Sequence, residues 1–392
     1  MKPRPLRDNI YWLGAVDWDR RLFDSLIPLP DGTSYNAYLV RGREKTALVD
    51  TADPAFETMF MDQLKGIGSI DYVISQHGEQ DHSGAIPAVL CRYPDAKVVA
   101  SSKAKELLIA HLNIEEKKIV TVEDGQQIDL GGYTLQFIYT PWVHWPETMC
   151  TYVKEEKLLF SCDFFGSHIA SSSLYADDEA MVYQAAKRYY AEIMMPFRSI
   201  IKNNIQKLEP LEIEMIAPSH GAVYRNPGFI IDAYREWISD TPKNLVVIPY
   251  ISMHGSTKKM VEHLVASLTE HSVAVKQFEL SGTDLGTLAI SLVDAATLVV
   301  ATPTVHMAPH PLVSYAAGLA NALHPKVKFA TVIGSYGWST KVAQRIAEQT
   351  SALKVTIIDP VLCKGNPGSD TFAKIDQLAD SIAVKHKEAG LD

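Results

Sequence analysis

The sequence predicts an α/β protein of two domains, in which a layered unit of strands and helices precedes a doubly wound unit with a parallel sheet. The chain has 392 residues, which is too long for one ordinary hydrophobic core. In the first two-thirds, apolar strands end repeatedly on histidine or carboxylate side chains. Near residues 239–243 the pattern changes to a regular alternation of strands and helices. We therefore predict domains at 1–243 and 244–392.

Composition and charge indicate a globular protein and exclude several functional classes. Apolar residues make up 47% of the chain, charged residues make up 21%, and the net charge is −9. An acidic chain without a basic run does not track a phosphate backbone, so we expect no nucleic-acid partner. No 18-residue apolar run and no signal peptide occur, so we expect no membrane association. Four scattered cysteines without a Cys-x-x-Cys pair argue against an iron–sulfur module or a disulfide framework, and they predict a cytoplasmic location.

The first domain opens with strands and then alternates strands with helices. Apolar, β-branched and aromatic runs predict strands at 9–14, 35–40, 45–50, 71–76 and 97–100. Helical patterns occupy 54–65, which Gly66 and Gly68 end, and then 83–93 and 103–112. A helical and aromatic stretch at 177–208 is expected to cover the pocket that the strand ends form.

Histidine and carboxylate side chains stand at the ends of four apolar segments of the first domain. The loop after strand 71–76 holds four of them within six residues, and segments 135–143, 157–162 and 214–219 are each followed by one more. Strand ends of a layered α/β domain gather at one edge, so we expect these side chains to meet there. Imidazole and carboxylate together suit iron, zinc or manganese. The candidate metal ligands are His77, Glu79, Asp81, His82, His144, Asp163 and His220.

Two further residues are candidates for a catalytic role beside these ligands. Tyr190, in the helical stretch 177–208, could hydrogen-bond a ligand of the metal, or it could be a packing tyrosine. His168 lies five residues beyond Asp163 and could support a metal ligand from behind by a hydrogen bond.

The second domain shows the alternation of a doubly wound, flavodoxin-like unit. Its strands are predicted at 244–251, 273–278, 297–301, 327–333 and 355–358, with helices between them and a last helix at 371–386. In such a unit the ligand lies at the carboxyl ends of the strands. The loop after the first strand combines a glycine, hydroxyls and a helix N-terminus, which suits one phosphate. A simple helix cap is the other interpretation of this loop.

Two further loops at strand ends strengthen the phosphate interpretation and point to FMN. They follow the third and fourth strands, and both resemble flavodoxin loops that flank an isoalloxazine ring. Trp338 is the candidate for packing near the ring, and burial in the core is the competing account. The candidate cofactor-binding residues are Ser252, Met253, His254, Gly255, Ser256, Thr257, Pro303, Thr304, Val305, His306, Ser335, Tyr336, Gly337 and Trp338.

The order of the seven candidate ligands resembles the signature of the metallo-β-lactamase fold, which is His-x-His-x-Asp-His followed by a distant His, Asp and His. Glu79 stands where that signature has its second histidine. An anionic oxygen donor favours the higher oxidation state of a redox metal, which a hydrolytic zinc site does not need. With this difference the chain resembles the flavodiiron protein family, over about residues 5–390.

The resemblance implies the fold, the cofactors and the ligand set. The fold would be a metallo-β-lactamase-like αββα sandwich followed by a flavodoxin-like domain, and the cofactors would be FMN and two non-haem iron ions. One iron would be held by His77, Glu79 and His144. The other would be held by Asp81, His82 and His220, with Asp163 as the bridge.

The resemblance also implies an activity and partners. The chain would be an oxidoreductase that reduces dioxygen to water, nitric oxide to nitrous oxide, or both. Electrons would pass through FMN from a separate donor, either a rubredoxin-type protein or a reduced deazaflavin coenzyme. The family forms head-to-tail homodimers, so a homodimer or a dimer of such dimers is expected.

Two readings from other functional classes stay open from the sequence. One is a dinuclear zinc hydrolase of the metallo-β-lactamase superfamily, against which Glu79 counts. The other is a flavin electron carrier or gas sensor without catalysis, against which the full ligand set counts.

Overall fold

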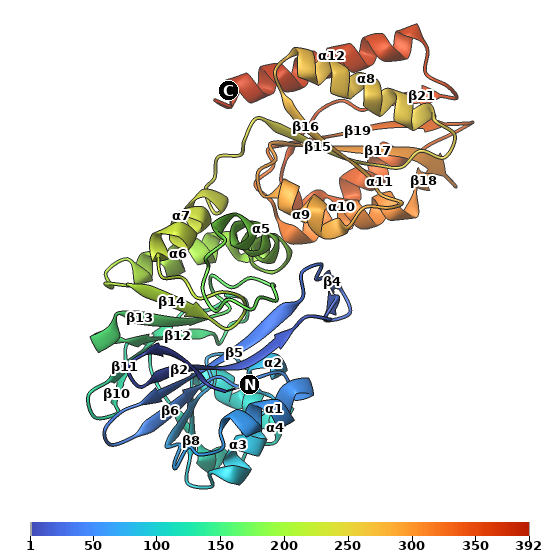
Figure 1. Ribbon diagram of the computed structural model, residues 1–392. Coiled ribbons are helices and arrows are strands. Elements are labelled where there is room, and N and C mark those ends of the chain that lie inside the picture. The colour runs from blue at the N-terminus through green and yellow to red at the C-terminus, as the bar shows by residue number, and fades with distance from the viewer. Residues whose placement is uncertain (1, 392) are drawn as a thin grey trace. The chain divides into compact units, whose positions relative to one another are not determined.

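The computed structural model describes residues 2–391 and divides the chain into two compact units (Figure 1). The first unit comprises residues up to Tyr190 together with Phe197–Ile238, and the second comprises Ala191–Pro196 together with residues from Ser239 onward. The main division therefore lies a few residues before 243/244.

The first unit contains a sheet of seven strands and a sheet of five. The seven-stranded sheet has the order β1 Arg4–Arg7, β2 Ile10–Asp17, β5 Thr33–Arg41, β6 Thr46–Val49, β7 Tyr72–Ile74, β8 Lys97–Ala100 and β9 Ile119–Thr121. The five-stranded sheet has the order β10 Gln127–Asp129, β11 Thr134–Tyr139, β12 Met149–Val153, β13 Leu158–Cys162 and β14 Met215–Pro218. A small hairpin is formed by β3 Leu22–Phe23 and β4 Ile27–Pro28.

Helices complete the layers of the first unit (Figure 1). They are α1 Glu57–Gln63, α2 Gln80–Ser83, α3 Ile86–Arg92, α4 Ser102–Leu112, α5 Glu179–Tyr189, α6 Arg198–Leu208 and α7 Pro227–Trp237. One apolar cluster joins the seven-stranded sheet to α1, α3 and α4, and it includes Leu48, Val73, Phe60, Val89 and Leu108. A second cluster fills the space between the two sheets, and it includes Trp12, Val49, Phe137, Phe160 and Met215. These layers confirm the predicted αββα sandwich.

The predicted helical stretch 177–208 is interrupted. A π-helical turn at Tyr190–Met194 and a 3₁₀ turn at Met195–Phe197 separate α5 from α6. Pro196 has no backbone N–H and disfavours α-helical geometry at the residue before it, so one continuous α-helix cannot run through this point. The predicted helix 83–93 corresponds to α3, Ile86–Arg92, and the short helix α2, which ends at Ser83, was not predicted.

The second unit is doubly wound around a parallel sheet. The main strands have the order β16 Ala274–Glu279, β15 Leu245–Tyr250, β17 Thr297–Val305, β19 Phe329–Tyr336 and β20 Thr356–Ile357. The short strands β18 Ala308–Pro309 and β21 Val361–Lys364 pair with β17 and β19. The helices are α8 Ser256–Glu270, α9 Leu285–Leu292, α10 Pro311–Leu323, α11 Val342–Gln349 and α12 Ser369–Glu388. This is the 2-1-3-4-5 strand order of flavodoxin-like proteins, which confirms the predicted fold class.

Two further observations bear on the expectations from composition. No helix among residues 2–391 has the length and apolar character that crossing a bilayer requires. The four cysteines are all free, and only Cys91 is exposed.

Candidate diiron and flavin sites

The ends of the strands and the loops that follow them bring the seven predicted metal ligands together in the first unit. His77 and Glu79 lie in the loop after β7, and the short helix α2, which begins at Gln80, carries Asp81 and His82. Asp163 directly follows β13, and His220 follows β14 by two residues. His144 is different, because β11 ends at Tyr139 and the histidine lies within the loop before β12. The predicted strand 135–143 is therefore too long.

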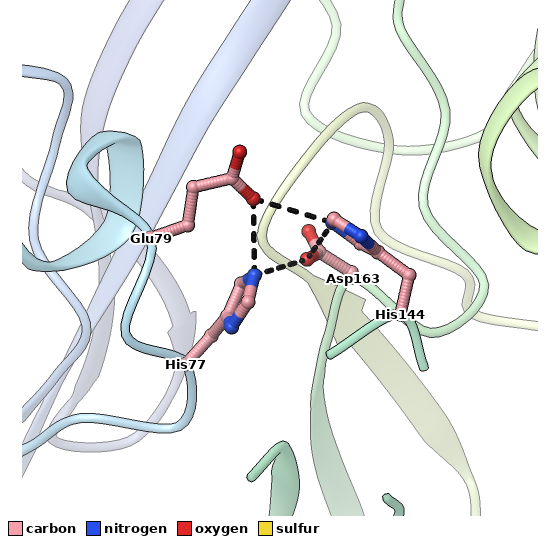
Figure 2. A group of neighbouring side chains, drawn as sticks. All are labelled: His77, Glu79, His144 and Asp163. Carbon is pink, nitrogen blue, oxygen red and sulfur yellow. Dashed lines mark hydrogen bonds and ion pairs between the residues drawn. The ribbon is translucent and has the colours of Figure 1, made fainter. Parts of the chain in front are cut away.

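Four of the ligand side chains form one half of the cluster (Figure 2). Glu79 Oε2 lies 3.0 Å from His77 Nε2 and 3.2 Å from His144 Nε2. Asp163 Oδ2 lies 3.4 Å from His77 Nε2 and 3.5 Å from His144 Nε2. Two imidazole nitrogens and two carboxylate oxygens thus converge on one small volume.

The other half of the cluster is built on the second oxygen of Asp163. Its Oδ1 lies 3.2 Å from His82 Nε2 and 3.4 Å from His220 Nε2. Asp81 completes this half, with Oδ1 3.4 Å from His82 Nε2 and Oδ2 3.2 Å from His220 Nε2. Asp163 therefore faces one trio with each of its two oxygens, which is the geometry of a bridging carboxylate.

The polar atoms of this cluster fit a pair of cations. Among residues 2–391, both carboxylate oxygens of Asp81 and of Asp163, together with His82 Nε2, are buried without a hydrogen-bond partner. Unsatisfied buried oxygens are costly, whereas oxygens that coordinate a cation are satisfied. The donor set, imidazole nitrogen with carboxylate oxygen and no thiolate, suits non-haem iron. His77, Glu79, His144 and Asp163 form one potential metal-binding group, and Asp81, His82 and His220 form another.

Hydrogen bonds behind the imidazoles orient two of them. His220 Nδ1 lies 2.7 Å from the Ser34 carbonyl oxygen, which only accepts, so Nδ1 carries a proton and the Nε2 of a neutral ring keeps its lone pair for the cluster. His77 Nδ1 lies 2.8 Å from Glu147 Oε1. Figure 2 shows the other nitrogen of His77 turned toward Glu79 and Asp163. Glu147 was not predicted, and its only signal in the sequence is an acidic residue three positions after His144.

The charges of the cluster shift its pKa values in the direction that a cation site needs. Burial alone would raise the pKa of Asp163, but the charges of His82, His77 and His220 hold it well below its usual range. Burial alone would lower the pKa of His77, but hydrogen bonds to Glu147 and Glu79 raise it. The Asp163 carboxylate therefore stays anionic, and the raised pKa of His77 shows that positive charge is favoured between the carboxylates around it.

Of the two candidate catalytic residues, His168 lies beside the cluster and Tyr190 packs among other aromatic side chains. His168 is buried, its Nδ1 lies 2.8 Å from Thr33 Oγ1, and its ring centre is 5.0 Å from that of His220. Burial and the charge of His220 lower its pKa, so the ring is neutral. Tyr190 instead packs on Tyr234 and Trp237, and its hydroxyl bonds the Trp237 carbonyl.

Tyr189, the residue before Tyr190, is the tyrosine that lies beside the cluster. Its ring centre is 4.8 Å from that of His168 and 6.1 Å from that of His220. Burial and the negative charge of Asp163 raise its pKa well above the ordinary value, so its hydroxyl stays protonated. The role considered for Tyr190, a hydrogen bond to a ligand of the metal, therefore suits the position of Tyr189 better. Adjacent residues of a helix point in different directions, so only one of the two tyrosines faces the cluster.

In the second unit, the three predicted flavin loops lie at the carboxyl ends of β15, β17 and β19. These strands are adjacent in the sheet, and β15 and β17 flank the point where the strand order reverses. Gly255 precedes the first residue of α8 and has φ +85°. The Lys258 N–H in the first turn donates to Ser252 Oγ at 3.1 Å, and a helix N-terminus of this kind suits a phosphate. The first and third loops are joined by the Thr257 and Ser335 hydroxyls at 3.1 Å.

The tips of the second and third loops are exposed. His306 and Met307 adopt positive φ at the turn between β17 and β18, and Trp338 is 87% exposed. Core burial of Trp338 is therefore excluded. Thr304 donates to Thr340 Oγ1 at 2.8 Å, so Thr340 is a member of this loop cluster that the sequence did not single out.

A chain that combines a cluster of histidines and carboxylates in an αββα sandwich with a second unit of flavodoxin topology defines a metal-dependent flavoprotein. The family model "ODP family beta lactamase" matches residues 33–221. Nitric oxide reductase of Moorella thermoacetica is 38% identical over 91% of this chain and 92% of its own length. Anaerobic nitric oxide reductase flavorubredoxin of Vibrio vulnificus is 33% identical over 97% of this chain and 80% of its own length.

Solved structures give the same result. Rubredoxin oxygen:oxidoreductase of Desulfovibrio gigas matches with a TM-score of 0.95 and 30% identity, and the match covers 99% of each chain. The flavodiiron protein of Giardia intestinalis matches with a TM-score of 0.92 and 25% identity, over 100% of this chain and 99% of its own. The chain belongs to the flavodiiron protein family. It is an oxidoreductase, and the predicted cofactors of the family, FMN and a non-haem diiron centre, are confirmed.

Proposed function

We propose that this chain reduces nitric oxide to nitrous oxide, dioxygen to water, or both, at the cluster around Asp163. The observation that carries the proposal is the placement of two ligand trios on the two oxygens of one buried carboxylate. Relatives named for nitric oxide reduction and for rubredoxin–oxygen reduction support the two gases as substrates.

In this proposal His77, Glu79 and His144 would hold one iron and Asp81, His82 and His220 would hold the second, with the Asp163 carboxylate shared between them. When bound, a pair of irons would supply redox equivalents and Lewis acidity for the reduction of a diatomic gas. The protein supplies three carboxylates and four imidazoles in a buried pocket, which fix the positions of both cations. Burial also keeps bulk water away from the site.

Exposure of the ligands indicates where a gas enters. The side chains of His144 and Glu79 are 18% and 12% exposed, whereas those of the other five ligands are at most 5% exposed. The most exposed side of the cluster is therefore the half that contains His144 and Glu79. A small gas would reach the cluster from this side and meet both metals there.

The proposal includes an FMN site, a donor and an assembly. The loops Ser252–Thr257, Pro303–His306 and Ser335–Trp338 would hold FMN, with its phosphate at the N-terminus of α8. A rubredoxin-type protein is the proposed donor, supported by the name of the Desulfovibrio gigas relative, and a reduced deazaflavin is the alternative donor. We also propose a head-to-tail homodimer, or a dimer of such dimers, in the cytoplasm, where the free cysteines would stay reduced.

Anaerobic stopped-flow mixing tests the activity. The chemically reduced full chain is mixed with nitric oxide or with dioxygen while the flavin spectrum is recorded, and nitrous oxide is measured in the headspace. The iron-loaded protein should reoxidise its flavin with at least one gas far faster than the same protein loaded with zinc. Equal rates for the iron and zinc forms would overturn the proposal.

A further inference from the structure

Two ligand imidazoles are supported from behind in chemically different ways. His220 Nδ1 bonds a neutral backbone carbonyl, that of Ser34. His77 Nδ1 bonds a carboxylate, Glu147 Oε1, at 2.8 Å. A second buried carboxylate beside the cluster, Asp50, directs its oxygens to Gln76 and Ser219.

Glu147 is held in place by its own surroundings. Its side chain is completely buried, and the Gly78 backbone N–H donates to the same Oε1 at 3.0 Å. Ser101 Oγ donates to the Glu147 backbone carbonyl at 2.9 Å. A methyl group added at Gly78 would lie 3.4 Å from Glu147 Oε1 and 3.2 Å from Leu107, so the loop and the carboxylate are packed closely. Glu147 therefore has a defined position behind His77.

We propose that Glu147 is a positioning residue that fixes His77 as an Nε2 ligand and strengthens cation binding in the His77–Glu79–His144 half of the cluster. This inference rests on the proposed function, because it assumes that the cluster binds two metal ions.

The physical basis is the charge-assisted hydrogen bond. With the Nδ1 proton directed to Glu147, the ring cannot turn its protonated nitrogen toward Glu79 and Asp163. A carboxylate behind the ring also makes Nε2 a stronger electron donor. Glu147 Oε1 accepts hydrogen bonds from both His77 and Gly78. The other carboxylate oxygen, Oε2, has no hydrogen-bond partner within residues 2–391. Removal of such a support typically weakens metal affinity by about 10- to 100-fold.

Zinc titration of the metal-free full chain tests this inference without any redox reaction. We expect wild-type protein to bind two zinc ions. In Glu147→Leu, the affinity for one of the two ions should fall by about 10- to 100-fold, while the other ion binds as before. Glu147→Gln keeps an oxygen that accepts the His77 proton but loses the charge, so one affinity should fall by a smaller factor.

Glu106→Leu is the matched control, because it makes the same substitution at an exposed glutamate of α4, away from the cluster. It should bind both zinc ions as the wild type does. Wild-type affinities in Glu147→Leu would overturn the inference. If that variant does not fold, Glu147→Gln decides, and unchanged affinity for both ions would overturn it. A wild-type protein that binds no zinc pair would contradict the proposed function instead.

Discussion

At the scale of single residues, Glu79 is the proposed metal ligand whose replacement has the clearest expected consequence. Its Oε2 approaches both His77 and His144. The other carboxylate near these two histidines, Asp163, also faces His82 and His220. Glu79→Ala should leave one iron per chain and reduce gas turnover to background, because a lost ligand weakens binding by more than the roughly 100-fold of a lost supporting residue. Iron analysis and a gas electrode measure both effects.

Gln80→Ala provides the control for Glu79→Ala. Gln80 is the exposed neighbour in the same segment, so its replacement should keep two irons and full turnover. Two irons and wild-type turnover in Glu79→Ala would show that the ligand assignment is wrong.

His386 in the second unit gives a prediction about pH. Its Nδ1 donates to Asn244 Oδ1 and its Nε2 accepts from the Thr297 hydroxyl, and burial lowers its pKa to about 4. An unfolded histidine gains its proton near pH 6.5, so between pH 6.5 and 4 the unfolded chain binds more protons than the folded chain. The contribution of His386 to stability therefore falls as pH is lowered through this window.

His386→Gln removes this titration and keeps polar atoms for both partners. Differential scanning calorimetry measures the Tm of wild type and variant at pH 7.5 and pH 5. The Tm of the variant should rise relative to that of the wild type as pH falls. A difference in Tm that is the same at both pH values would contradict the prediction.

At the scale of secondary-structure elements, the first turn of α8 depends on the backbone of Gly255. An added Cβ would meet nothing within 4 Å, but the φ of +85° is unfavourable for other residues. Gly255→Ala should therefore cost about 1–2 kcal/mol of folding free energy and weaken FMN binding, since the helix start would shift. Urea unfolding and titration with FMN by flavin fluorescence measure these effects.

Gly282→Ala is matched to Gly255→Ala, because its Cβ also meets nothing and its φ lies outside the left-handed region. It should change neither stability nor FMN affinity appreciably. Equal behaviour of the two variants would show that the Gly255 conformation has no role in the site.

Phe160 connects the two sheets of the first unit. Its ring on β13 stacks on Tyr38 of β5 with centroids 4.7 Å apart, and both are buried. Phe160→Ala should destabilise this unit by about 3–5 kcal/mol, and iron content should fall with it because Asp163 follows the same strand. Guanidinium unfolding monitored by circular dichroism measures the free energy of unfolding. A decrease of less than about 1 kcal/mol in Phe160→Ala would contradict the assigned packing.

The elements show what the sequence could predict of the site. Buried strands followed by His77, Asp163 and His220 were readable, because an apolar run ending on a polar residue is a local pattern. The loop around His144 was not, since Pro141 ends the pairing of β11 and Trp142 adopts a φ of +62°. The pairing of Glu147 with His77 depends on tertiary structure. No local pattern decides which of two adjacent tyrosines faces the cluster, because the turn after Tyr189 departs from regular α-helical geometry.

At the scale of the whole molecule, each unit brings one half of a redox system. The first provides two groups of side chains that could hold a pair of cations on either side of Asp163, and the second provides a loop cluster at the carboxyl ends of a parallel sheet. The sequence predicted both folds, because their strand and helix periodicities differ and change sharply near residue 240. The donor and the preferred gas depend on surfaces and pocket shape that no local pattern records.

Crystallographic anomalous scattering from iron-loaded protein tests the central claim most directly. Difference maps collected at the iron absorption edge should show two peaks in the first unit. The carboxylate of Asp163 should lie between them, one peak beside His77, Glu79 and His144 and the other beside Asp81, His82 and His220. A single peak, or iron bound away from Asp163, would contradict the account.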